Sequence, residues 1–306
     1  MQMNFELQKP SSIVSLATSA VLVSIDVNIW SATKQDRVIS SEVTSSKKAV
    51  DSAGKFTKNL LAGNQQHKDI HNYRQTIYNW LKRKTFRWND SQDLLPVTDL
   101  EQFKEEYSEH QKEFYRLLDS FMMRYQSIVS DMAFAQGDMF NRDDYPTPEQ
   151  VRAKFGISLY VSEVPSHDFR CQISNDIASD LKQQYEHQAE RIVENVLSQQ
   201  ITRITEVMES ISHCCGEQTI TDSKTGETKT KKRKIYDTTI TKAKELCKTL
   251  QGFRPTNNEV SDRLMEVAKR LSQTLQGVDR ETLRDSDVVR DKVKNDVDDI
   301  LSKFKF

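Results

Sequence analysis

Hydrophobic residues along most of the chain recur every three or four positions, with polar residues between them. This period is typical of amphipathic helices, because 3.6 residues complete one turn and place such positions on one face. Gly and Pro residues, which end or interrupt helices, separate the periodic stretches. The helices predicted in this way span about residues 31–62, 66–84, 99–136, 148–155, 175–212, 238–251, 258–276 and 280–304.

Two other stretches, near 21–29 and 157–164, alternate between apolar and polar residues. Alternation is typical of half-buried strands, so we expect these two strands to pair in a small sheet. Between 218 and 236, Thr-rich flanks surround Gly226, which predicts a protruding β-hairpin, with a mobile loop as the alternative. The predicted fold class is therefore mainly α (α+β), with long antiparallel, coiled-coil-like helices, the small β-sheet and this hairpin.

The predicted helix at 175–212 is the longest in the chain. At 1.5 Å per residue it would reach about 50 Å or more, which exceeds a compact domain of this size. We therefore predict an N-terminal helical domain with the small sheet at 1–165, and a long-helix region with the hairpin and a C-terminal bundle at 166–306. The near-heptad apolar stripe on the long helix is predicted to be an interaction surface, as in coiled coils. Its residues are Leu181, Tyr185, Ile192, Val196, Ile204, Val207 and Ile211.

Composition excludes several classes of protein. Only 8 Gly and 6 Pro occur in 306 residues, too few for a collagen-like or Pro-rich chain. The 44 Lys and Arg residues are balanced by 45 Asp and Glu, whereas a dedicated duplex-binding protein usually has a basic domain. Four cysteines without a regular spacing indicate free thiols in a reducing compartment.

We expect no association with a membrane. The most apolar stretch, from Ile13 to Trp30, is interrupted by Asp26 and is shorter than the roughly 20 residues that a spanning helix needs. A signal peptide that ends near Ala20 is the alternative, but no clear basic cluster precedes it.

Basic residues cluster on the predicted hairpin, with only Glu227 to oppose them nearby. Cations on a protruding arm are suited to neutralising phosphates, which predicts salt-dependent binding of nucleic acid. The alternative is an edge hairpin that uses Lys side chains to block aggregation. A second basic face, between Lys34 and Arg87, is explained either by charge matching with the acidic start of the next helix or by the same binding. The candidate nucleic-acid-binding residues are Lys224, Lys229, Lys231, Lys232, Arg233 and Lys234.

No motif of a known catalytic or cofactor site occurs in the chain. It has no glycine-rich phosphate loop, no Gly-x-Ser-x-Gly elbow, no His-Glu-x-x-His and no Cys-x-x-Cys. We therefore predict no enzyme activity, no catalytic residues and no cofactor; an enzyme with a dispersed site is the alternative. A metal site at His213, Cys214, Cys215 and Cys247 is not expected, because adjacent ligands lack the spacing that wraps around an ion.

Three segments carry a resemblance to a known family. They are Val23 to Lys34 with its Ile29-Trp30-Ser31 step; Tyr145-Pro146 through to Asp168-Phe169-Arg170; and Ile235-Tyr236-Asp237-Thr238-Thr239 through to Leu283-Arg284-Asp285-Ser286 and Arg290. Together they resemble an uncharacterised family of tailed-phage and integrative-element proteins, described only as a domain of unknown function. The resemblance implies a gene that often neighbours a MoxR/CobS-like AAA+ ATPase, and it implies no catalytic residues.

Two functions are predicted from these observations. The first is a non-enzymatic phage or mobile-element interaction protein in the host cytoplasm, which forms homo-oligomers and acts as a scaffold or as an adaptor for an AAA+ ATPase. The second is a nucleic-acid-binding accessory protein of DNA recombination or processing, which uses the Lys-rich hairpin arm.

Overall fold

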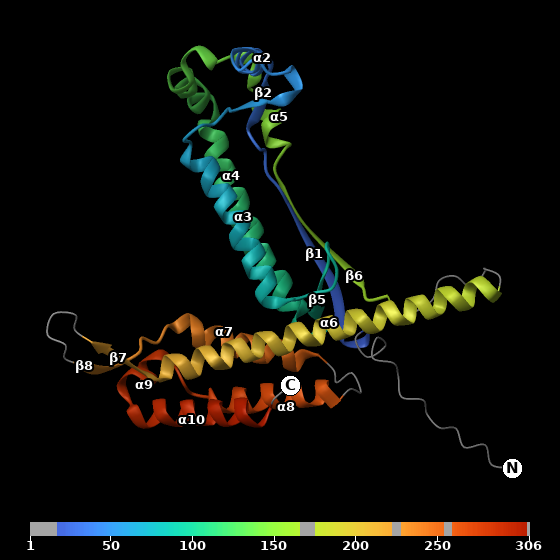
Figure 1. Cartoon of the computed structure of the whole chain (residues 1–306), viewed down its shortest axis with the longest axis vertical. Coiled ribbons are helices and arrows are strands. Elements are labelled where there is room, and N and C mark those ends of the chain that lie inside the picture. Colours follow the sequence, from blue (N-terminus) through green and yellow to red (C-terminus); the bar gives the residue numbers. More distant parts are fainter. Residues whose placement is uncertain (1–16, 166–174, 222–227, 254–258, 305–306) are drawn as a thin grey trace. The chain divides into compact units, whose positions relative to one another are not determined.

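The computed structural model describes residues 17–165, 175–221, 228–253 and 259–304. Most of these residues are helical, with a few short antiparallel strands, which confirms the predicted mainly α class (Figure 1). The chain divides into two compact units. Unit 1 comprises Met1–Ser24, Leu81–Phe103 and Val161–Phe306, and unit 2 comprises Ile25–Trp80 and Lys104–Tyr160.

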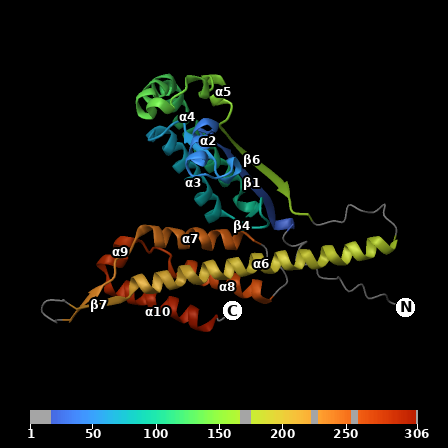
Figure 2. The same cartoon turned by 45° about the horizontal axis from the view of Figure 1, so that its top comes forward.

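Unit 1 is built around the longest helix, α6 (Asn175–Cys215). Three further helices pack against it, α7 (Asp237–Gly252), α8 (Glu259–Thr274) and α10 (Asp287–Lys303), as Figure 2 shows. Each presents apolar residues at helical spacing to a common core. The predicted helix at 280–304 is divided into α9 (Arg280–Asp285) and α10. Ser286 adopts an extended conformation between them, and its hydroxyl accepts a hydrogen bond from the backbone N–H of Val289, which begins α10.

A four-stranded sheet has the order β4 (Phe86–Arg87), β5 (Asp93–Pro96), β1 (Ala20–Asn28) and β6 (Gly156–Glu163). The neighbouring positions of β1 and β6 confirm the predicted pairing. Strand β5 is antiparallel to β1, with Ala20 opposite Pro96, and every residue of β5 is buried. Strands β4 and β5 were not predicted from the sequence, because two and four residues are too short to show an alternating pattern.

Unit 2 contains most of two long helices, α3 (Gln65–Lys84) and α4 (Leu100–Gln136). The two helices are antiparallel, because a residue near the start of α3 contacts a later position of α4 than a residue near the end of α3 does. Gln66 donates a hydrogen bond to Ser120, and Trp80 donates one to Glu106. A short helix, α5 (Pro148–Arg152), begins at a capping box formed by Thr147 and Gln150.

The helix predicted for residues 31–62 is wrong. This segment forms β2 (Thr33–Asp36), α2 (Arg37–Ser46), a 3₁₀ turn (Asp51–Ala53) and β3 (Phe56–Asn59), with β2 and β3 paired antiparallel. The carboxylate of Asp36 caps the start of α2. Lys48, just after the end of α2, has a φ of 53°, which is incompatible with a continued right-handed helix. The apolar residues behind the prediction do not form a buried face, because Val38 and Val50 are 68% and 72% exposed.

The two units differ from the predicted division into 1–165 and 166–306. The chain leaves unit 1 after Ser24, returns at Leu81, leaves again after Phe103 and returns at Val161. Each unit therefore combines stretches that are far apart in the sequence, and a single boundary cannot describe them. None of the helices in the described ranges combines the length and the apolarity that a membrane span requires.

A close approach of the backbone in unit 1 requires glycine at the end of α7. A Cβ atom at Gly252 would lie 2.7 Å from Oγ1 of Thr98 and 2.8 Å from Cβ of Pro96. We expect Gly252→Ala to lower the free energy of unfolding by about 1–3 kcal/mol, since overpacking displaces neighbouring atoms. Gly156→Ala is the matched control, because no atom other than those of Gly156 and its two chain neighbours lies within 4 Å of its Cβ position. Urea unfolding of both variants tests this, and equal midpoints would contradict it.

Candidate functional site

The predicted basic arm is a hairpin of β7 (Glu217–Thr221) and β8 (Thr228–Lys232), with Glu217 opposite Lys232. Lys224 lies outside the described residues, and so does the side chain of Lys229.

Three of the other four basic side chains of the arm contact the chain itself. Lys232 forms an ion pair with Asp287, and a guanidinium N–H of Arg233 donates a hydrogen bond to the carbonyl of His213 over 3.3 Å. The ammonium of Lys234 lies 5.3 Å from the ring centre of Tyr236. Lys231 is exposed. Part of the basic charge is therefore used within unit 1.

The predicted interaction stripe on α6 is largely covered where the structure describes it. Val196, Ile204 and Ile211 are buried in the core of unit 1. Ile192 and Val207 are half-buried. The side chains of Leu181 and Tyr185 lie outside the described residues, and a docking role for that part of α6 stays a prediction. The spacing of apolar residues could not distinguish a seam for another molecule from a seam for the chain's own helices.

A buried arginine that sequence reasoning missed joins α10 to the end of α6. Arg290 is 4% exposed, and its guanidinium donates to the carbonyls of Cys214, Cys215 and Arg233 over 2.6–2.8 Å, and to that of Gly216 over 3.2 Å. The last carbonyls of a helix have no intrahelical partner, and a cation stabilises them. Helical spacing could have revealed this buried position, because Arg290 lies on the same face of α10 as the buried residues Val293, Val297 and Ile300.

Three of the four cysteines, Cys214, Cys215 and Cys247, are free thiols. Cys215 and Cys247 are buried, Cys214 is half-buried, and Cys171 lies outside the described residues. Burial raises the pKa of Cys247 to about 12 and raises the pKa of Cys215, so both thiols keep their protons at neutral pH. Within the described ranges, no three His, Cys, Asp or Glu side chains are grouped so that they could hold a metal ion.

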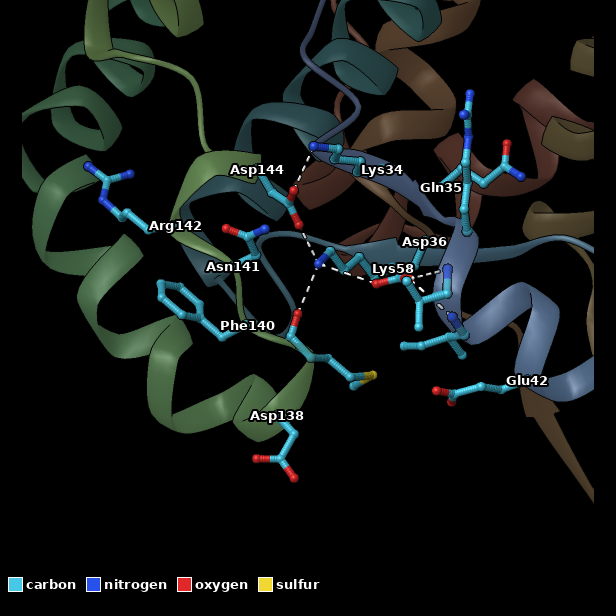
Figure 3. A pocket seen from close by; sticks show the side chains of 14 residues that line it. Lys34, Gln35, Asp36, Glu42, Lys58, Asp138, Phe140, Asn141, Arg142 and Asp144 are labelled. Atoms are coloured by element: carbon cyan, nitrogen blue, oxygen red, sulfur yellow. Dashed lines mark hydrogen bonds and ion pairs between the residues drawn. The ribbon is translucent and has the colours of Figure 1, made fainter.

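A pocket of about 770 Å³ in unit 2 is lined by charged residues from β2, α2 and β3 and from residues 138–144 (Figure 3). Lys58, which is 7% exposed, lies at its centre. Its ammonium pairs with the carboxylates of Asp144 and, at 3.6 Å, Asp36, and donates to the carbonyl of Met139 over 2.9 Å. Lys34 pairs with Asp144 from the other side at 2.6 Å. The four charges balance, and the cluster joins the β2–β3 hairpin to the segment that follows α4.

The pKa of Asp144 shows how this cluster is stabilised. Burial alone would raise this pKa, but the hydrogen bonds and charges of Lys34 and Lys58 outweigh burial and bring it below its usual range. The carboxylate therefore stays ionised at neutral pH, and its two cations hold it in place. A group that is fully paired in this way is poorly suited to proton transfer, so the cluster supports structure rather than catalysis.

A buried histidine in unit 2 makes the stability of this unit depend on pH. Nε2 of His67 donates to the carbonyl of Trp30 over 2.8 Å, and its ring lies 4.7 Å from that of His71. Burial, opposed in part by the Trp30 carbonyl and aided by His71, lowers the pKa of His67. The folded state therefore favours neutral His67, so this contribution to stability is full above the unfolded pKa, about 6.5, and is lost as the pH falls toward the folded pKa.

We expect the melting temperature to fall between pH 7.5 and pH 5.0, and His67→Gln to reduce that fall. Glutamine keeps a hydrogen-bond donor but does not titrate. His213→Gln, at an exposed position in unit 1, is the control and should leave the pH dependence unchanged. Differential scanning calorimetry at both pH values measures this, and an equal fall in wild type and His67→Gln would refute the assignment.

Comparison with protein families identifies the family to which the chain belongs. The model of the family described as major capsid protein Gp23 matches residues 35–252, more than two thirds of the chain. The chain belongs to the Gp23 major capsid protein family. Neither the curated proteins nor the solved structures that were compared with it gave a match. The Gp23 family is a family of phage proteins, which confirms the phage origin implied by the resemblance, whereas nothing supports the neighbouring AAA+ ATPase or the family of unknown function.

Membership of the Gp23 family corrects both predicted functions. Gp23 is a major capsid structural protein of phage, so an adaptor for an AAA+ ATPase and a nucleic-acid-binding accessory protein are both wrong. Capsid proteins associate with copies of themselves, which agrees with the predicted homo-oligomer. The described part of the apolar stripe is largely covered within unit 1, and part of the basic arm pairs within the same unit. Whether either surface binds another molecule stays a prediction.

Proposed function

We propose that this chain is the repeating subunit of a phage capsid shell and assembles with many copies of itself inside the host cell. The observation that carries the proposal is the match of the major capsid protein Gp23 model to residues 35–252. The chain would act through surfaces that bind other copies, with no chemical step.

Exposed apolar side chains on both units support the proposal. Val38, Met123 and Phe134 in unit 2 and Val288 in unit 1 are each at least two-thirds exposed. Single exposed apolar side chains are common on protein surfaces, whereas those that share one face, as Met123 and Phe134 do on α4, commonly mark contact surfaces. A shell subunit needs several such surfaces, because each copy must bind several neighbours to close a shell.

Quantitative mass spectrometry of purified particles of the encoding phage tests the proposal. We expect peptides of this chain to be the most abundant of all particle proteins, with many copies per particle. Peptides from a known non-structural protein of the same phage are the control for carry-over. Absence of the chain from the particles, or a copy number no higher than that of minor particle proteins, would contradict the proposal.

A further inference from the structure

Helix α4 buries one face and leaves the opposite face uncovered. Phe114, Phe121 and Tyr125 on the inward face are fully buried. On the outward face, Met123 and Phe134 are 87% and 91% exposed, the most exposed large apolar side chains of the described chain. Eleven residues separate them, which is close to three helical turns, so both point in nearly the same direction.

The residues between these two side chains make the surface nearly uncharged. We define the outer α4 face as Met123, Ser127, Ser130 and Phe134, all of them exposed. The face lies on one continuous helix. Its small serine side chains allow a second helix to approach closely between Met123 and Phe134.

Two opposite charges lie beside the outer α4 face. Arg124 and Asp131 are exposed, and their spacing of seven residues places both on the same flank of the face. Within the described part of the chain, neither side chain forms a hydrogen bond or an ion pair. Both charges are therefore available to a partner, and they have opposite signs.

We propose that the outer α4 face binds the same face of a second copy, antiparallel, across a two-fold axis; this inference rests on the proposed function. The spacing makes the surface self-complementary. With the axis near the middle of the face, Met123 packs against Phe134 of the partner subunit, and Ser127 lies beside Ser130 of the partner subunit. The same rotation keeps corresponding flanks together and places Arg124 beside Asp131 of the partner subunit. One contact then contains two apolar pairs and two ion pairs.

The charges select the antiparallel arrangement. A parallel two-fold pairing would put the Arg124–Asp131 flanks of the two copies on opposite sides, and all four charges would remain unpaired. The antiparallel pairing satisfies all four, which favours one orientation over the other. An isologous contact of this kind is the commonest way in which identical subunits associate.

Charge reversal in the full-length chain gives the sharpest test. Arg124→Asp and Asp131→Arg, each alone, turn two attractive contacts into repulsive ones, and we expect self-association in sedimentation velocity to weaken about tenfold or more. An equimolar mixture of the two variants should recover nearly wild-type association, because a mixed pair restores both ion pairs. Lys104→Asp, at an exposed position of α4 away from the outer face, is the control and should behave as the wild type.

A photo-crosslink provides an independent measurement. Benzoylphenylalanine in place of Phe134 should form an intermolecular adduct that maps to Met123, both in solution and in assembled particles. The same group in place of Val288, an exposed residue of unit 1, should give no adduct at Met123. Failure of the mixture to recover association, or adducts that map elsewhere, would overturn the inference. If the chain is abundant in particles but these tests fail, only the α4 contact is wrong; if the chain is absent from particles, the proposed function itself fails.

Discussion

Arg290→Met is expected to lower the free energy of unfolding of unit 1 by about 3–4 kcal/mol, because four backbone carbonyls lose their donor. The carbonyls belong to the last residues of α6, to Gly216 and to Arg233 after the hairpin, and Arg290 is itself buried. Methionine fills a similar volume but cannot donate. The acceptors that remain buried then destabilise the folded state, because water satisfies them only in the unfolded chain.

Hydrogen exchange measured by mass spectrometry should locate the effect of Arg290→Met. Peptides at the end of α6 and in α10 should exchange faster, while peptides of unit 2 should not change. Arg284→Met is the control, because Arg284 is exposed and pairs only with its neighbour Asp285, so its loss should change stability by no more than about 0.5 kcal/mol. Equal effects of the two substitutions would show that the guanidinium of Arg290 contributes no special stability.

Lys58→Met is expected to destabilise unit 2 by about 2–4 kcal/mol. The substitution leaves the carboxylate of Asp144, whose side chain is 6% exposed, with Lys34 as its remaining cation and leaves Asp36 without its ion pair to Lys58. Removing one partner of a buried ionic cluster is more costly than removing an exposed pair, because the remaining charge is desolvated without compensation. Asp144→Asn in the Lys58→Met background should recover part of the loss, since the uncompensated charge disappears.

The pH dependence of the Lys58→Met effect checks its cause. The pKa of Asp144 is lowered in the folded protein, so the stability that its ionised form contributes is present above the unfolded pKa, about 3.9, and is lost as the pH falls through the folded pKa. Urea unfolding of wild type and Lys58→Met should therefore differ most above about pH 5 and less as the pH falls below 4. Lys112→Met, which removes only an exposed pair with Glu109, is the control. A difference that does not depend on pH would contradict the electrostatic explanation.

The long elements could be predicted from the sequence, because each repeats a period over many residues. α3, α4 and α6 begin and end close to the predicted positions, and β1 lies beside β6 as expected. The segment after β2 could not be predicted, because its apolar residues occur at helical spacing although Val38 and Val50 are exposed. Spacing indicates which residues share a face, but not whether that face is buried.

The roles of the residues at the candidate sites could be predicted from the sequence even less than the fold could. The charge of Lys58 is part of a basic run in the sequence, but in the structure the side chain is buried between carboxylates from β2 and from residue 144, more than 80 residues away. Arg290 likewise finds its acceptors more than 50 residues away. Helical spacing places Met123 and Phe134 outside the apolar stripe of α4, but only the structure shows that no other described segment covers them. Contacts between distant segments decide these roles, and a local pattern does not contain them.

Electron cryomicroscopy of the phage particle would show directly whether this chain forms the shell. We expect a shell whose repeating density accommodates unit 1 and unit 2, each fitted separately, with the 41-residue helix α6 resolved as a continuous rod in every copy. A shell density that neither unit fits would contradict the assignment of this chain as the capsid subunit.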